Sequence, residues 1–135
     1  MNAKVEITIS HVSDAIDELT TALELSKEER LQACQTALDS LKETPLYHHS
    51  PAFLCGRMFE AWGGIKDAVS DLEIMIQTPD EKIDKANLVK MLIPGLAASL
   101  EYLLISDREY QERRQTVWEN FLSKCEVFTL IGHKV

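Results

Sequence analysis

The chain has 135 residues and a formal net charge of −8, from 22 acidic and 14 basic side chains. This length suits one domain with a sizeable core, and the acidity disfavours direct nucleic-acid binding or attachment to an anionic membrane, which both need basic side chains. Gly and Pro are sparse, at 5 and 4 residues, which favours a few long helices over a sandwich or barrel.

The N-terminal segment alternates Val5, Ile7 and Ile9 with polar residues, a period-two pattern typical of extended chain. We therefore expect an extended lead-in and a first helix that begins near Ser10 or Ser13. In that helix the apolar residues recur every three or four positions, the spacing of a bundle seam. They are Val12, Ile16, Leu19 and Leu23.

Cap residues mark the second and third helices. Ser26-Lys27-Glu28-Glu29 matches a capping box, so the second helix is expected to start there. It ends at Thr44-Pro45, because the residue before a proline resists the helical conformation, and a loop follows over residues 44–49. Ser50-Pro51 predicts a third helix that runs to Gln77, since serine is a favoured cap and proline fits the first turn.

Two further starts are predicted at residues 78–81 and 106–109. Thr78-Pro79-Asp80-Glu81 combines a cap, a proline and a capping-box glutamate, so a fourth helix should run from there to Ile105. Ser106-Asp107-Arg108-Glu109 is another capping box and predicts a fifth helix. The apolar side of that helix comprises Tyr110, Val117, Trp118, Phe121, Cys125 and Phe128. Short connections favour antiparallel neighbours, so we expect an all-α, up-and-down bundle of four to five helices in a single domain over residues 1–135.

The most apolar stretch is residues 88–105, which Pro94-Gly95 interrupts. It is about long enough to span a bilayer, but its charged residues and its proline favour a buried central helix with a bend at Pro94. In an antiparallel hairpin Gly63-Gly64 would lie at a similar height. These glycines either make room for the bend, or they form a ligand pocket together with Trp62 and Pro94. That pocket would comprise Trp62, Gly63 and Pro94.

No catalytic or metal-binding pattern stands out. His48 and His49, with Cys55 downstream, have a spacing that fits no structural zinc site. The sequence has no Glu-x-x-His pair, phosphate-binding glycine loop, Gly-x-Ser-x-Gly or His-Glu-x-x-His motif. We therefore expect no enzymatic activity, no metal and no cofactor.

The three cysteines lie far apart and form no Cys-x-x-Cys pair, which indicates a reducing compartment. The N-terminus lacks the basic and apolar regions of a signal peptide. We expect a cytoplasmic protein.

Acidic residues crowd the outer side of the first two predicted helices. They either maintain solubility or form a docking surface for a basic partner, since charge speeds encounter. We predict a non-enzymatic protein–protein interaction module, such as an inhibitor, an immunity-type protein or an adaptor; a small-molecule-binding bundle is the alternative. Long apolar helices also favour a homodimer. The expected partner-binding residues are Asp14, Asp17, Glu18, Glu24, Glu28, Glu29 and Tyr47.

Overall fold

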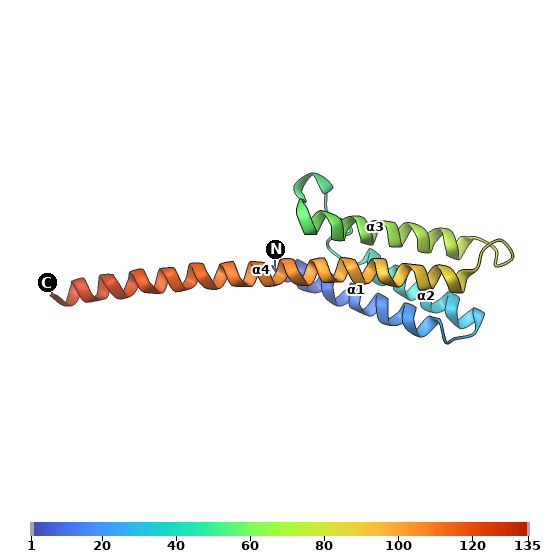
Figure 1. Ribbon diagram of the computed structural model, residues 1–135, viewed down its shortest axis with the longest axis horizontal. Coiled ribbons are helices and arrows are strands. Elements are labelled where there is room, and N and C mark those ends of the chain that lie inside the picture. The colour runs from blue at the N-terminus through green and yellow to red at the C-terminus, as the bar shows by residue number, and fades with distance from the viewer. Residues whose placement is uncertain (1, 135) are drawn as a thin grey trace.

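Four helices form an up-and-down bundle, and the last of them continues far beyond it (Figure 1). The computed structural model describes residues 2–134, except for the side chains of Asn2, Phe53, Phe121 and residues 124–134. The helices pack in a ring, with α1 against α2 and α4, and α3 against α2 and α4. No strand occurs among residues 2–134, so the predicted all-α bundle is confirmed. The elements are α1 Asn2–Ala22, α2 Lys27–Lys42, the 3-10 turn η1 Pro51–Phe53, α3 Gly56–Gln77 and α4 Lys85–Lys134.

One apolar core joins all four helices. Leu19 of α1, Leu41 of α2, Leu72 of α3 and Leu96 of α4 are each at most 1% exposed. Burying a side chain of this size stabilises the fold by roughly 1.5–3 kcal/mol. The three- and four-residue spacing predicted for the first helix does point into this core, since Val12 and Leu19 belong to it and Ile16 and Leu23 pack against it.

The prediction of an extended N-terminus is wrong, because α1 begins at Asn2. Thr8 explains the error: it occupies a core position and is 1% exposed. Its hydroxyl donates to the Lys4 carbonyl at 2.8 Å and accepts from the Leu46 amide at 3.4 Å. A buried threonine with both bonds made acts as part of the helical stripe, whereas the sequence pattern counted it as polar.

The predicted third helix begins later than expected. Ser50-Pro51 opens only the short turn η1, and Leu54 and Cys55 then adopt extended backbone angles. Gly56 follows with a φ of 56°, a left-handed conformation that costs an ordinary residue roughly 1–2 kcal/mol. The chain therefore reverses at Gly56, and α3 proper runs from there to Gln77 as predicted.

The fourth helix starts at Lys85 instead of Thr78. Asp84 caps it, because the Asn87 amide donates to its carboxylate at 3.1 Å. Thr78 instead ends α3, with its hydroxyl donating to the Ile74 carbonyl at 2.6 Å. The α3–α4 connection is thus longer than the tight turn that the sequence predicted.

A separate fifth helix does not exist, since α4 runs without a break from Lys85 to Lys134 and includes Pro94. Ser106 and Asp107 lie inside it and cap nothing. A capping-box sequence can also lie inside a helix when the residues before it are already helical. The sequence Ser106-Asp107-Arg108-Glu109 therefore does not by itself end one helix and begin another. Of the predicted fifth-helix apolar side, Tyr110, Val117 and Trp118 are exposed. The side chains of the other three residues, Phe121, Cys125 and Phe128, lie outside the described part of the chain.

The matching defects of α3 and α4 make a close helix–helix contact. A methyl group at Gly64 would overlap the Ser99 hydroxyl and would lie 3.8 Å from the Gly95 carbonyl oxygen. Ser99 is 2% exposed, and its hydroxyl donates to the Gly95 carbonyl at 3.2 Å. Nothing lies within 4 Å of the equivalent position at Gly63. Gly64 therefore makes room for Ser99 and for the backbone at Gly95, whereas the predicted role of the glycines in accommodating a bend at Pro94 stays a prediction.

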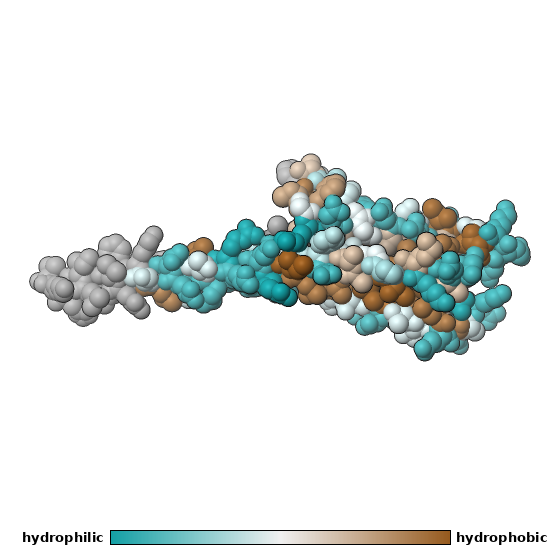
Figure 2. Space-filling view, viewed as in Figure 1, coloured by the Kyte–Doolittle hydropathy of each residue, from teal (hydrophilic) through white to brown (hydrophobic). Residues whose placement is uncertain are grey.

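Residues 88–105 are buried on one side only. Val89, Leu96 and Leu103 are at most 1% exposed, whereas Met91 is 66% and Leu104 45% exposed. Figure 2 shows apolar side chains on the bundle part of α4 that faces the viewer. By length and composition the part of α4 over residues 85–120 could cross a bilayer, with 28% of its most apolar window buried. A core helix passes the same test, so this property does not by itself identify a membrane span.

Candidate functional site

The predicted acidic residues lie on α1, on α2 and around the turn between them. Asp14, Asp17, Glu24, Glu28 and Glu29 are exposed, and the neighbouring Glu18 is partly buried. Among the described residues none of these six carboxylates forms an ion pair. In the described part of the chain, these carboxylates on the α1 surface and at the turn therefore have no basic side chain within ion-pair distance.

Basic residues approach this surface at the end of the bundle that holds both the α1–α2 turn and the α3–α4 connection. A hollow of about 570 Å³ there is lined by Glu28 together with Lys27, Arg30, Asp80 and Lys85. Lys85 pairs with Asp80 at 2.8 Å, and this hydrogen bond lowers the pKa of the Asp80 carboxyl. Charge in this hollow is mixed, so the purely acidic surface is the part carried by α1.

Arg30 holds the α1–α2 turn in place. Its Nε donates to the Ala22 carbonyl and its Nη2 to the Leu25 carbonyl, both at 3.2 Å. These two carbonyls belong to the end of α1 and the turn, where helical partners run out. The Arg30 guanidinium therefore stabilises the α1–α2 turn through backbone hydrogen bonds and, within the described part of the chain, forms no ion pair with the nearby carboxylates.

Tyr47 does not join the acidic residues. It is half-buried between α2 and α3, where the Lys66 ammonium lies 3.9 Å from its ring centroid. Its ring also meets that of His48 edge-on, with the centroids 5.0 Å apart. A cation over an aromatic face is attracted by the ring quadrupole, so Tyr47 already has a partner within the chain.

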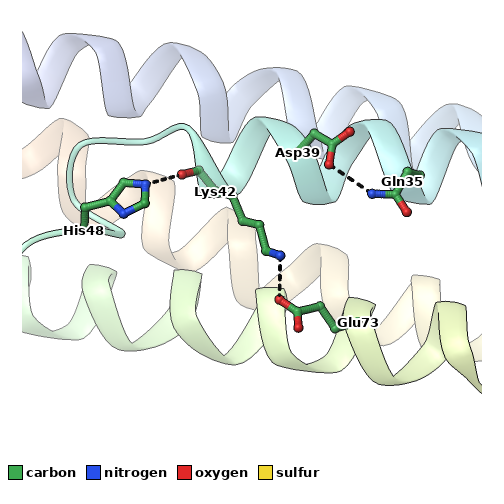
Figure 3. A network of polar contacts seen from close by, with 5 residues as sticks. All are labelled: Gln35, Asp39, Lys42, His48 and Glu73. Atoms are coloured by element: carbon green, nitrogen blue, oxygen red, sulfur yellow. Dashed lines mark hydrogen bonds and ion pairs between the residues drawn. The ribbon is translucent and has the colours of Figure 1, made fainter.

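The loop between α2 and η1 is tied down by polar contacts (Figure 3). His48 Nε2 donates to the Lys42 carbonyl at 2.6 Å, and the Lys42 ammonium pairs with Glu73 of α3 at 3.0 Å. The hydrogen bond to Glu73 raises the pKa of Lys42. His49 Nδ1 contacts the carbonyl of Ser50 at 3.0 Å. Among the described residues no group of three His, Cys, Asp or Glu side chains could hold a metal ion.

The proposed pocket residues are only partly brought together. Trp62 stacks on Phe59 with centroids 5.6 Å apart, and its indole N–H is buried without an acceptor. Gly63 has open space where a side chain would be, and Pro94 is exposed on α4. The hollows on either end of the bundle include none of the three residues.

The feature that the sequence did not predict is the arm, which we define as residues 107–134 of α4. It leaves the bundle beside the N-terminus of α1 (Figure 1). A hollow of about 700 Å³, the arm-base hollow, lies where it leaves. Its lining includes Val5, Met58, Asp107, Tyr110 and Val117. The sequence does contain a pattern that indicates the arm, because apolar residues recur at seven-residue intervals along α4. The helix boundary predicted at Ser106 interrupts that pattern.

Glu109 joins the base of the arm to α3 through Arg57, and it also pairs with Arg113 within α4. The Arg57 guanidinium lies 2.6 Å from one carboxylate oxygen of Glu109, and that of Arg113 lies 4.0 Å from the other. One carboxylate oxygen of Asp107 is buried without a partner. The arm therefore has a fixed direction at its base and an unused acceptor beside it.

No protein-family model matches this chain, and comparison with curated proteins and with solved structures gives no significant match.

Proposed function

We propose that this chain is a non-enzymatic protein-interaction module that docks a basic protein partner through the acidic side chains of α1 and of the α1–α2 turn. The observation that carries the proposal is the exposure of Asp14, Asp17 and Glu24 together with the lack of any ion pair to them among the described residues. Negative charges that are not paired within the protein attract a positively charged partner at long range and increase the rate at which the two proteins associate. An inhibitor, immunity-type or adaptor role fits such a surface.

The test is an affinity purification from an extract of the source cells, with a matched pair of charge variants. One variant is Asp14→Asn, Asp17→Asn and Glu24→Gln. The control carries Glu60→Gln, Asp67→Asn and Asp71→Asn on α3, whose carboxylates are also exposed and unpaired within the described part. Both variants remove three negative charges, so only the position of the charge differs.

We expect the α1 variant to lose a basic partner by roughly tenfold, and the α3 control to retain it. Raising the salt concentration should release the same partner from the wild type, because screening shortens the reach of exposed charges. Equal recovery by both variants, or binding that persists unchanged in high salt, would rule out docking through the acidic surface.

The alternative function is small-molecule binding beside Trp62. The buried indole N–H without an acceptor favours it, because an unpaired buried donor is costly and a ligand oxygen would satisfy it. A thermal-shift screen of metabolites should then give stabilising compounds whose effect disappears in Trp62→Phe. Hits that stabilise Trp62→Phe equally would exclude this site.

A further inference from the structure

The apolar seam that builds the bundle continues into the arm. Val89, Leu96, Leu103, Tyr110 and Val117 follow one another at seven-residue intervals along α4. The first three are 0%, 1% and 0% exposed, whereas Tyr110 is 42% and Val117 68% exposed. Residues seven apart share one side of a helix. The side of α4 that is buried in the bundle therefore continues beyond Leu103 and becomes exposed at Tyr110 and Val117.

A second row of residues alternates with the first and completes a coiled-coil seam. Ile93 and Leu100 pack against the core, and the row continues with Asp107 and Arg114 in the arm. Further along the sequence the four–three alternation reaches Phe121, Lys124 and Phe128, whose side chains lie outside the described part. An apolar stripe with occasional polar residues is typical of a helix that pairs with another helix.

The charge of the arm differs from that of the bundle. Residues 107–135 carry five acidic and five basic side chains, so the formal net charge of −8 lies entirely on residues 1–106. Two arms can meet without net repulsion, whereas two bundles cannot. A strongly basic partner gains nothing from the arm, which leaves a helix of similarly balanced charge as the matching occupant.

We propose that the arm pairs with the arm of a second copy of this chain, as an antiparallel two-helix coiled coil that makes the protein a dimer. The arm is about 42 Å long at 1.5 Å per residue, and a contact strip about 12 Å wide covers roughly 500 Å² on each copy. The total of about 1,000 Å² reaches the lower limit for a specific interface. This self-pairing is independent of the acidic surface on α1.

The antiparallel direction follows from charge and from the arm-base hollow. In a parallel pair Asp107 would face Asp107 of the second copy, and Arg114 would face Arg114, so like charges would share the seam. A parallel pair would also set the two acidic bundles side by side. The antiparallel pair separates the bundles by about 40 Å, several times the screening length of about 8 Å, and brings the tip of each arm to the hollow of the other copy.

The test compares the wild type with Val117→Glu and with the control Met91→Glu, using light scattering and sedimentation over a concentration series. Both residues are on α4 and similarly exposed, at 68% and 66%, so neither substitution disturbs the core of the monomer. We expect a wild-type dimer, a dissociation constant raised at least about tenfold by Val117→Glu, and no change in Met91→Glu. A wild type that is monomeric at its highest soluble concentration overturns the proposal, as does a dimer that Val117→Glu leaves intact or that Met91→Glu also disrupts.

Small-angle X-ray scattering of the wild-type dimer tests the direction. An antiparallel pair extends over about 110 Å with a bundle at each end, whereas a parallel pair extends over about 80 Å. A distance distribution with two separate maxima supports the antiparallel pair. A single compact maximum overturns that direction.

Discussion

Gly63 and Gly64 are neighbours in α3, yet replacing them with alanine should change stability in opposite directions. Alanine is preferred to glycine inside a helix by about 1 kcal/mol. At Gly63 no steric clash opposes this gain, because no atom outside the adjoining part of α3 lies within 4 Å of the added methyl group. At Gly64 the methyl group would overlap the Ser99 hydroxyl.

The cost at Gly64 follows from the surroundings of Ser99. If Ser99 turns away, it gives up its 3.2 Å bond to the Gly95 carbonyl, and a buried hydroxyl left unpaired costs about 1–3 kcal/mol. If instead α3 and α4 move apart, overpacking costs a similar ~1–3 kcal/mol. After the helix-propensity gain of about 1 kcal/mol is subtracted, Gly64→Ala should destabilise the fold by up to about 2 kcal/mol, and Gly63→Ala should stabilise it by up to ~1 kcal/mol.

Urea unfolding at one fixed protein concentration, followed by circular dichroism, measures both changes. The double variant Gly64→Ala/Ser99→Ala is the control. It removes the overlapping hydroxyl and leaves the Ser99 Cβ 3.4 Å from the new methyl group, so the helix-propensity gain should reappear and the double variant should be more stable than Ser99→Ala by up to about 1 kcal/mol. If Gly64→Ala proves as stable as Gly63→Ala, the close approach of α3 and α4 at this point is not what requires the glycine.

Three further predictions concern single sites. Gly56→Ala should cost about 1–2 kcal/mol in urea unfolding because φ is 56° there, and an unchanged midpoint would contradict a left-handed Gly56. The hydrogen bond from Lys85 lowers the pKa of the Asp80 carboxyl, so the pair stabilises the fold at pH values above the ordinary pKa of 3.8, and this contribution disappears as pH falls through the folded pKa. Lys85→Met should raise the pKa of Asp80, measured by NMR titration, back toward 3.8. A pKa that does not change in this variant would count against the pair. Burial raises the pKa of the Cys34 thiol, so a thiol reagent should modify exposed Cys55 first and Cys34 only on unfolding, which mass spectrometry of the modified chain can check.

The helical seams could be predicted because apolar spacing reports burial directly. Val12 and Leu19, predicted to be one seam, are both fully buried. The same rule failed around Thr8, whose burial depends on the Leu46 amide, 38 residues away in sequence. Local polarity cannot reveal that a distant backbone group will satisfy a hydroxyl.

Helix boundaries were less predictable, because whether a cap residue begins a helix, ends one or lies inside one depends on the packing of the residues around it. Thr78 resembles a start and serves as an end, since its hydroxyl reaches back to the Ile74 carbonyl. Asp84, which does cap α4, did not stand out in an acidic chain. Caps contribute about 1 kcal/mol, which the packing of the whole helix can override.

The acidic residues of the candidate surface were predictable as exposed, but their neighbours were not. Glu28 shares a hollow with Lys85, which follows it by 57 positions in the sequence. Tyr47 was predicted as a partner-binding residue of the loop, and the structure places it against Lys66 of α3. Such pairings depend on which helices are adjacent, and that order becomes visible only once the bundle has formed.

The unbroken course of α4 joins two regions that should open to solvent by different routes. Amide hydrogens beside Val89 and Leu96 can exchange with deuterium only when the bundle itself opens, because their side chains lie in its core. Amides beyond Val117 belong to the same hydrogen-bond ladder, yet in a lone copy they are protected only by the helix, which frays from its end. Deuterium uptake along α4 should therefore change steeply near Asp107, and pairing of two arms would shift that boundary toward the C-terminus without altering the helix.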